Sequence, residues 1–120
     1  MSLNLNKKNL VFIFVLSFVF FSCSKAKVQV VNVENCQTEV SFSKDILPIM
    51  ESNCVGCHNS KNPSAGFDLS NYKGVSNKPS IVLSSVKQDG SAKSMPLSYK
   101  LADSLIQKIN CWIYQGSKNN

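Results

Sequence analysis

Cys54-Val55-Gly56-Cys57-His58 is the stretch that decides the fold of this chain. Two thiols separated by two residues, with a histidine directly after the second, form the attachment signature of a c-type haem. Each thiol can add to one vinyl group of the porphyrin, and the imidazole is then held under the iron as an axial ligand. We therefore expect one haem c, covalently attached through Cys54 and Cys57, with His58 as the proximal ligand.

Other chemistries can use the same three side chains. A thiol–disulfide enzyme would use Cys54 and Cys57, but it would need a preceding strand and a thioredoxin-like βαβ pattern, and neither is visible. A zinc site would use both thiols and His58, with no obvious fourth ligand beyond Cys36 or Cys111. The 7 acidic residues are scattered and form no acid–base pair, so we do not expect an enzyme.

The N-terminal part of the chain is typical of a lipoprotein export signal. Residues 1–9 are polar and positive, and residues 10–21 form an almost continuous apolar run that is shorter than a membrane span. Cys23 then follows a small residue and resembles the lipid-bearing cysteine of a bacterial lipobox. We predict a signal peptide over 1–22 and a membrane-proximal tether over 23–40, although an uncleaved N-terminal anchor is an open alternative. Either arrangement holds the domain at a membrane of the bacterial cell envelope, facing the periplasm.

The charge of the chain excludes one class of partner. The net charge is +6, and the 13 basic residues are dispersed lysines. Nucleic-acid binding usually needs a clustered basic face and arginines that grip phosphates, so we expect no nucleic-acid partner. A mildly positive surface suits brief encounters with acidic redox proteins, because opposite charge raises the association rate. Simple solubility explains the same surface equally well.

Helical patterns flank the motif. A helix of about ten residues, which Ser43 or Asp45 can cap, is expected to run into the first thiol of the motif. Short helices are expected near 69–74 and 81–88, within otherwise polar loops. On a helical wheel, the apolar residues from 101 to 113 fill one arc, so the last helix is amphipathic.

The 5 cysteines can all be assigned. Cys54 and Cys57 belong to the haem motif and Cys23 to the lipid anchor. Cys111 falls on the polar side of the last predicted helix, where a core cysteine would not be placed. We predict a disulfide between Cys36 and Cys111, which leaves no free thiol, as an oxidising compartment favours.

Several groups of residues outside and inside the motif match one known family. They are Phe42 to Ile49, Cys54 to His58, Leu69 to Tyr72, Met95-Pro96, Trp112-Ile113, Gly116 and Asn119-Asn120. On these residues the chain resembles class I cytochromes c, in particular a short monohaem lipoprotein type. The resemblance implies an all-α domain over 41–120, with N- and C-terminal helices packed around one covalently bound haem and long loops. Leu97-Ser98-Tyr99 is a departure, because related chains often have a glycine-rich stretch there.

Two methionines of the mature chain could be the distal ligand. Met95 lies in a loop that can cross to the far face of a haem, whereas Met50 lies on the helix before the motif, where methionine usually packs in the core. A thioether ligand stabilises ferrous iron and closes the second axial position, so Met95 predicts an electron carrier between exported redox proteins. The alternative is a haem-based sensor or ligand-binding module with an open axial position.

Overall fold

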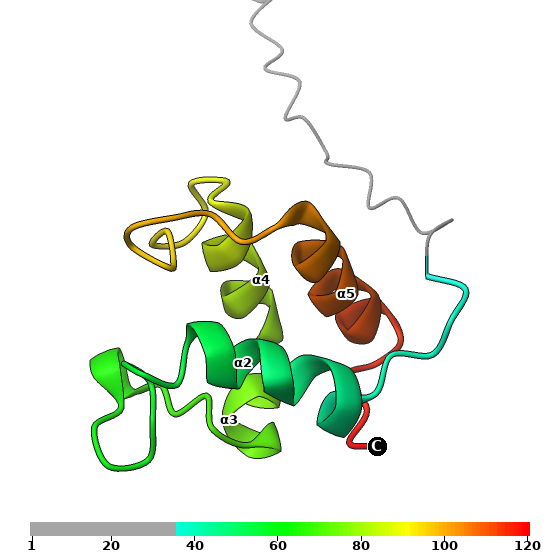
Figure 1. The fold of residues 1–120 in the computed structure, drawn as a ribbon, viewed down its shortest axis with the longest axis horizontal. Coiled ribbons are helices and arrows are strands. Elements are labelled where there is room, and N and C mark those ends of the chain that lie inside the picture. The colour runs from blue at the N-terminus through cyan, green and yellow to red at the C-terminus, as the bar shows by residue number, and fades with distance from the viewer. Residues whose placement is uncertain (1–35) are drawn as a thin grey trace, which may run out of the picture. The chain divides into compact units, whose positions relative to one another are not determined.

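The computed structural model describes residues 36–120. The predicted signal peptide over 1–22, the lipid-bearing Cys23 and the tether as far as residue 35 lie outside the described residues. Within 36–120 the chain is helical and has no strand, so the prediction of an all-α fold is confirmed for this part (Figure 1). In chain order the elements are η2 (Phe42–Ile46), α2 (Leu47–Asn53), η3 (Ser64–Gly66), α3 (Tyr72–Asn77), α4 (Pro79–Lys87) and α5 (Asp103–Tyr114).

The helix that leads into the motif consists of the π-helical turn η2 followed directly by α2. Ser41 is its N-cap, because Ser41 Oγ accepts a hydrogen bond from the backbone N–H of Lys44 at 3.3 Å. The Asp45 carboxylate accepts a hydrogen bond from the Ser41 N–H at 3.0 Å. The two side chains therefore satisfy two backbone N–H groups of the first turn in a reciprocal arrangement. The sequence predicts Ser43 or Asp45 as the cap, and the structure corrects this prediction. Ser41 is the N-cap, and Asp45 accepts a hydrogen bond from its backbone N–H. Pro48 lies in the first turn of α2, where its missing N–H costs little.

The start of η2 is also held by the far end of the chain. Asn120 accepts a hydrogen bond from the Phe42 N–H through Oδ1 at 2.9 Å. Its backbone oxygen accepts one from the Ser43 N–H at 3.0 Å and one from Ser41 Oγ at 2.8 Å. The residues after α5 therefore close the open N–H groups of the first helix.

The two short helices α3 and α4 are bounded in different ways. Asn71 starts α3, because its Oδ1 accepts a hydrogen bond from the Gly74 N–H at 3.0 Å. Pro79 starts α4, and Gln88, with φ of 57°, ends it in the left-handed conformation. Both helices are displaced from the predicted 69–74 and 81–88 by a few residues, since periodicity alone does not identify the capping residue.

The core forms where α5 packs against η2 and α4. Figure 1 shows α4 beside α5. Trp112 lies at the centre of this core and is fully buried. Its ring centroid lies 5.7 Å from that of Phe42, and the Phe42 ring packs edge-on against Tyr72 at 5.2 Å. Trp112 Nε1 donates a hydrogen bond to the backbone oxygen of Lys118 at 2.9 Å, so the indole is satisfied by the chain itself. None of the helices in 36–120 is long and apolar enough to cross a bilayer.

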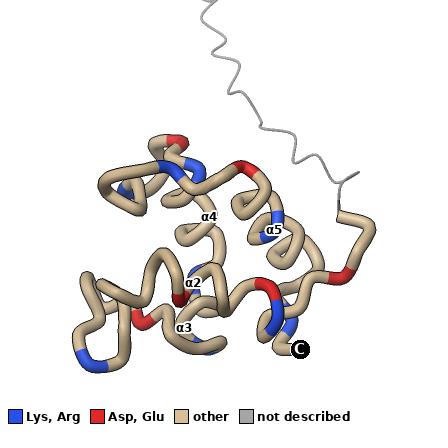
Figure 2. The backbone as a smooth tube through the Cα atoms, viewed as in Figure 1, with Lys and Arg blue, Asp and Glu red and all other residues tan. Residues whose placement is uncertain are grey.

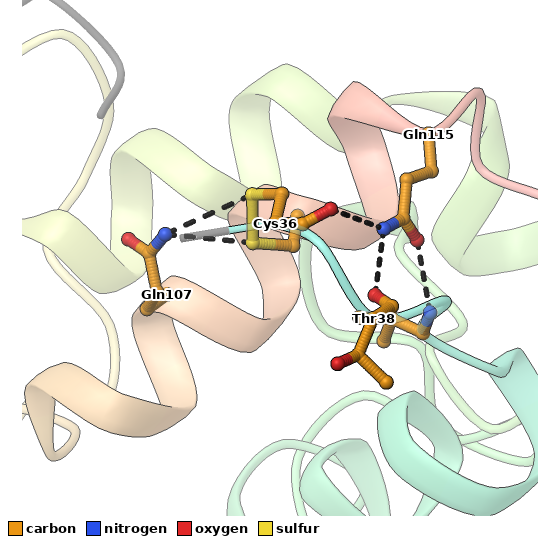
Figure 3. Close-up of a disulfide and its surroundings, with 6 residues drawn as sticks. Cys36, Thr38, Gln107 and Gln115 are labelled. Atoms are coloured by element: carbon orange, nitrogen blue, oxygen red, sulfur yellow. Dashed lines mark hydrogen bonds between the residues drawn. A yellow bond between two sulfur atoms is a disulfide. The ribbon is translucent and has the colours of Figure 1, made fainter. Parts of the chain in front are cut away.

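Residues 36–40 lie along α5, as Figure 3 shows. Cys36 and Cys111 form a disulfide, which is the predicted pairing. The side-chain amide of Gln115 donates hydrogen bonds to the backbone oxygens of Cys36 at 3.2 Å and Thr38 at 2.8 Å. Its Oε1 accepts one from the Val40 N–H at 2.9 Å. The end of the predicted 23–40 tether is thus part of the folded unit.

Candidate functional site

The motif forms a tight turn at the end of α2. The backbone N–H groups of Cys54 and Val55 both donate to the Met50 oxygen, at 2.8 and 3.0 Å, and so finish the helix. The N–H groups of Cys57 and His58 then donate to the Cys54 oxygen, at 3.1 and 2.9 Å. The helix end and the turn together place two thiols and one imidazole within a single compact stretch of backbone.

The two thiols differ in their surroundings. Cys54 is half-buried and Cys57 is exposed, and neither forms a disulfide. Burial raises the pKa of the Cys54 thiol to about 11, so this thiol is protonated near neutral pH. A thiol–disulfide enzyme lowers the pKa of its attacking cysteine and places it after a strand, whereas here a helix comes first. Both observations count against thiol exchange.

The His58 ring is oriented by the loop that follows it. Its Nδ1 lies 3.3 Å from the backbone oxygen of Phe67. A neutral imidazole that donates from Nδ1 to a carbonyl keeps its lone pair on Nε2, which is the tautomer that a metal ligand requires. The Phe67 ring packs edge-on at 6.4 Å from the imidazole, and the Leu69 N–H donates to the His58 oxygen at 2.8 Å. The residues present therefore fit an iron ligand on the Nε2 side of this ring.

The loop between the motif and Phe67 is stabilised by one side chain in particular. Asn59 Oδ1 accepts hydrogen bonds from the N–H groups of Lys61 at 3.1 Å and Asn62 at 2.9 Å. Asn59 Nδ2 donates to the Val55 oxygen at 3.0 Å, which joins the loop to the turn of the motif. Neither Asn59 nor the Phe67 carbonyl was identified from the sequence. An asparagine in a polar loop is only a weak sequence signal for a side chain that stabilises a turn. The position of a backbone carbonyl leaves no signal in the sequence.

The two candidate distal methionines lie in different environments. Met50 is fully buried on α2 and belongs to the hydrophobic core. Met95 is half-buried in the long loop between α4 and α5, and its N–H donates to the Ser85 oxygen at 3.0 Å. Met50 is therefore a packed core side chain in this structure, whereas Met95 lies on a loop outside the hydrophobic core.

The loop that carries Met95 is joined to the helix that ends at the motif. Tyr99 Oη donates a hydrogen bond to Asn53 Oδ1 at 2.9 Å, and Asn53 immediately precedes Cys54. Two apolar side chains of this loop face solvent, since Leu97 is 76% exposed and Tyr99 is 49% exposed.

A separate depression of about 350 Å³ lies along α3 and the loop at 65–68. It contains none of Cys54, Cys57, His58 and Met95. Among residues 36–120, no three histidine, cysteine, aspartate or glutamate side chains gather in an arrangement that could hold a metal ion. Cys54, Cys57 and His58 therefore share one turn of backbone without their side chains converging as a metal site would require, which counts against zinc. Met95 lies on a second loop.

Comparison of the chain with protein-family models, with curated proteins and with solved structures found no match. Cys54 and Cys57 are outside any disulfide, His58 Nδ1 faces a backbone carbonyl, and the half-buried Met95 lies on a separate loop. Thiols, imidazole and thioether are the side-chain types that haem attachment and ligation use.

Proposed function

We propose that this chain is a monohaem c-type cytochrome that carries single electrons between exported redox partners. Cys54 and Cys57 would hold the haem covalently, and His58 and Met95 would be its axial ligands. The observation that carries the proposal is the Phe67 carbonyl behind His58 Nδ1, because it prepares Nε2 for a metal directly after two unpaired thiols. When bound, the haem supplies an Fe²⁺/Fe³⁺ couple whose potential depends on these ligands.

Electron transfer is supported over catalysis by the ligand set. With His58 and Met95 as its two ligands, a bound haem would have no coordination position left open for a substrate. A neutral thioether favours the ferrous state and raises the reduction potential. We therefore do not propose an enzyme. The sensor or ligand-binding alternative requires Met95 to leave the iron readily, which is a measurable property.

The arrangement of the helices supports a class I cytochrome fold as part of the proposal. The helix before the motif packs against the last helix, through Phe42 of η2 and Trp112 of α5. The long loops before α3 and after α4 are tolerable in a domain this small if a bound haem adds apolar volume to a limited core.

The proposed place of action is the bacterial cell envelope. The disulfide between Cys36 and Cys111 supports this location, because disulfides persist in oxidising compartments such as the periplasm. Cys23 would carry the lipid that anchors the domain to a membrane. Lysine and acidic residues are interspersed along the coloured part of the chain in Figure 2, and on that ground we expect no nucleic-acid partner. The partners of this protein would be redox proteins that donate electrons to it and accept electrons from it.

The test is production of the full chain in a host that attaches c-type haem. We expect one haem that stays with the chain on a denaturing gel and gives a reduced-minus-oxidised spectrum of a c-type cytochrome. Replacing both thiols, with Cys54→Ser and Cys57→Ser, removes the covalent haem, whereas Cys36→Ser with Cys111→Ser keeps it. A colourless chain overturns the proposal. Strong carbon monoxide binding to the reduced protein favours the sensor alternative.

A further inference from the structure

The loop between α4 and α5 is held at one end by Gln88, the C-cap of α4. Gln88 Nε2 donates to the backbone oxygens of Tyr99 at 3.2 Å and Pro96 at 3.5 Å. The Met95 N–H donates to the Ser85 oxygen in the last turn of α4 at 3.0 Å. These contacts fasten both sides of the loop to the end of one helix, and they do not involve the helix of the motif.

A single hydrogen bond joins this loop to the motif's helix. Tyr99 Oη donates to Asn53 Oδ1 at 2.9 Å across 46 residues of sequence. Asn53 is the last residue of α2, and its Nδ2 donates to the Ile49 oxygen one turn earlier at 2.8 Å. That second bond fixes the orientation of the Asn53 side-chain amide, so its Oδ1 is already placed to accept the hydrogen bond from Tyr99.

We infer that Tyr99 is a positioning residue for Met95. Its hydroxyl holds the Met95 loop against the end of α2, and the strength of that contact governs how readily the thioether leaves the iron. The inference rests on the proposed function, because it concerns the distal ligand of the haem that Cys54 and Cys57 would attach. Tyr99 is 49% exposed and contributes little to the core, so removal of its hydroxyl acts on the loop and leaves the fold intact.

The experiment measures carbon monoxide binding to the reduced, haem-loaded full chain. Carbon monoxide can bind only after Met95 dissociates, so the limiting rate at high concentration reports that dissociation. Tyr99→Phe should raise this rate about five-fold, the change that one neutral hydrogen bond corresponds to. Asn53→Ala should raise this rate by a similar factor. Because both variants remove the same hydrogen bond, the double variant should raise the rate by less than the product of the two single factors.

The matched control is Tyr114→Phe, which removes a hydroxyl from a tyrosine that is 61% exposed on α5. It should leave the rate unchanged. Amide hydrogen exchange over residues 91–98 of the haem-loaded chain should become faster in Tyr99→Phe and not in Tyr114→Phe.

The outcomes separate this inference from the proposed function. A haem-loaded wild-type chain with a sulfur-to-iron band supports the proposed function by itself. If Tyr99→Phe then binds carbon monoxide at the wild-type rate, the positioning role is refuted and the cytochrome proposal stands. If the wild-type chain carries no haem, or lacks the sulfur ligand, both ideas are refuted.

Discussion

His58 Nδ1 lies 3.3 Å from the backbone oxygen of Phe67, nine residues later in the chain. This contact determines which nitrogen of the ring is free, because the nitrogen that donates to a carbonyl cannot also bind a metal. The loop that supplies the carbonyl is shaped by Ala65 and Gly66, which both have positive φ, of 54° and 76°. The orientation of the ring therefore depends on a backbone path rather than on another side chain.

The two methionines should respond to truncation in opposite ways. Met95→Ala should abolish a sulfur-to-iron charge-transfer band in the haem-loaded protein, because it removes the thioether from the loop. Met50→Ala should keep that band and lower the free energy of unfolding by about 3 kcal/mol, since Met50 is fully buried. Absorption spectra and chemical denaturation measure the two effects. A band that persists in Met95→Ala and disappears in Met50→Ala would reverse the assignment.

Loss of the disulfide should destabilise the domain without removing the haem. Cys36 and Cys111 are 75 residues apart, and closing a loop of that length contributes about 4 kcal/mol in the chain-entropy account. We expect Cys36→Ser with Cys111→Ser to lower the free energy of unfolding by about that amount in urea denaturation. Retention of wild-type stability would mean that the bond does not form in the exported protein.

Gln115 should contribute to stability separately from the disulfide. Its side chain makes three hydrogen bonds to the backbone of residues 36–40, so Gln115→Ala should cost about 2 kcal/mol and speed amide exchange there. Gln107→Ala is the matched control, because the Gln107 amide reaches only the two sulfur atoms, at 3.4 and 3.8 Å. Equal losses in both variants would argue against the hydrogen bonds to the backbone as the cause.

Asp45 should make stability depend on pH in the acidic range. A hydrogen bond from Lys108, followed by one from the Ser41 N–H, lowers the pKa of the Asp45 carboxyl below its ordinary value of 3.8. Its contribution is therefore complete above pH 3.8 and is lost as the pH falls through the lower, folded-state pKa. Asp45→Asn should cost about 1 kcal/mol at pH 7, because the Lys108 pair is partly screened by solvent, and progressively less below pH 3.8. A difference that grows in acid would contradict this sign.

Gly74 should tolerate no side chain. A Cβ at this position would overlap the backbone oxygen of Asp68, which cannot move without displacing the loop. We expect Gly74→Ala to lower the free energy of unfolding by about 3 kcal/mol. Gly56→Ala is the control, since nothing lies within 4 Å of the Cβ it would introduce, and its effect should stay within about 0.5 kcal/mol. Thermal denaturation of both variants tests the contrast.

Sequence reasoning succeeded where the signal was local and strong. The amphipathic arc from 101 to 113 predicts the last helix, and the structure has α5 over Asp103–Tyr114. The polar position of Cys111 on the same helix predicts its disulfide with Cys36. The cap of the first helix is Ser41 and not Ser43 or Asp45, because periodicity does not show which polar side chain accepts the first free N–H groups.

The sequence by itself determined the chemistry that the chain can offer: two thiols and a histidine at fixed spacing, one methionine in a polar loop and one in an apolar helix. Covalent spacing and periodicity are properties of the chain, so they are readable without a fold. The tertiary structure decided which of these groups are usable. It buried Met50, turned His58 toward the Phe67 carbonyl and joined Tyr99 to Asn53, because these contacts link residues whose separation in the chain says nothing about their distance in space.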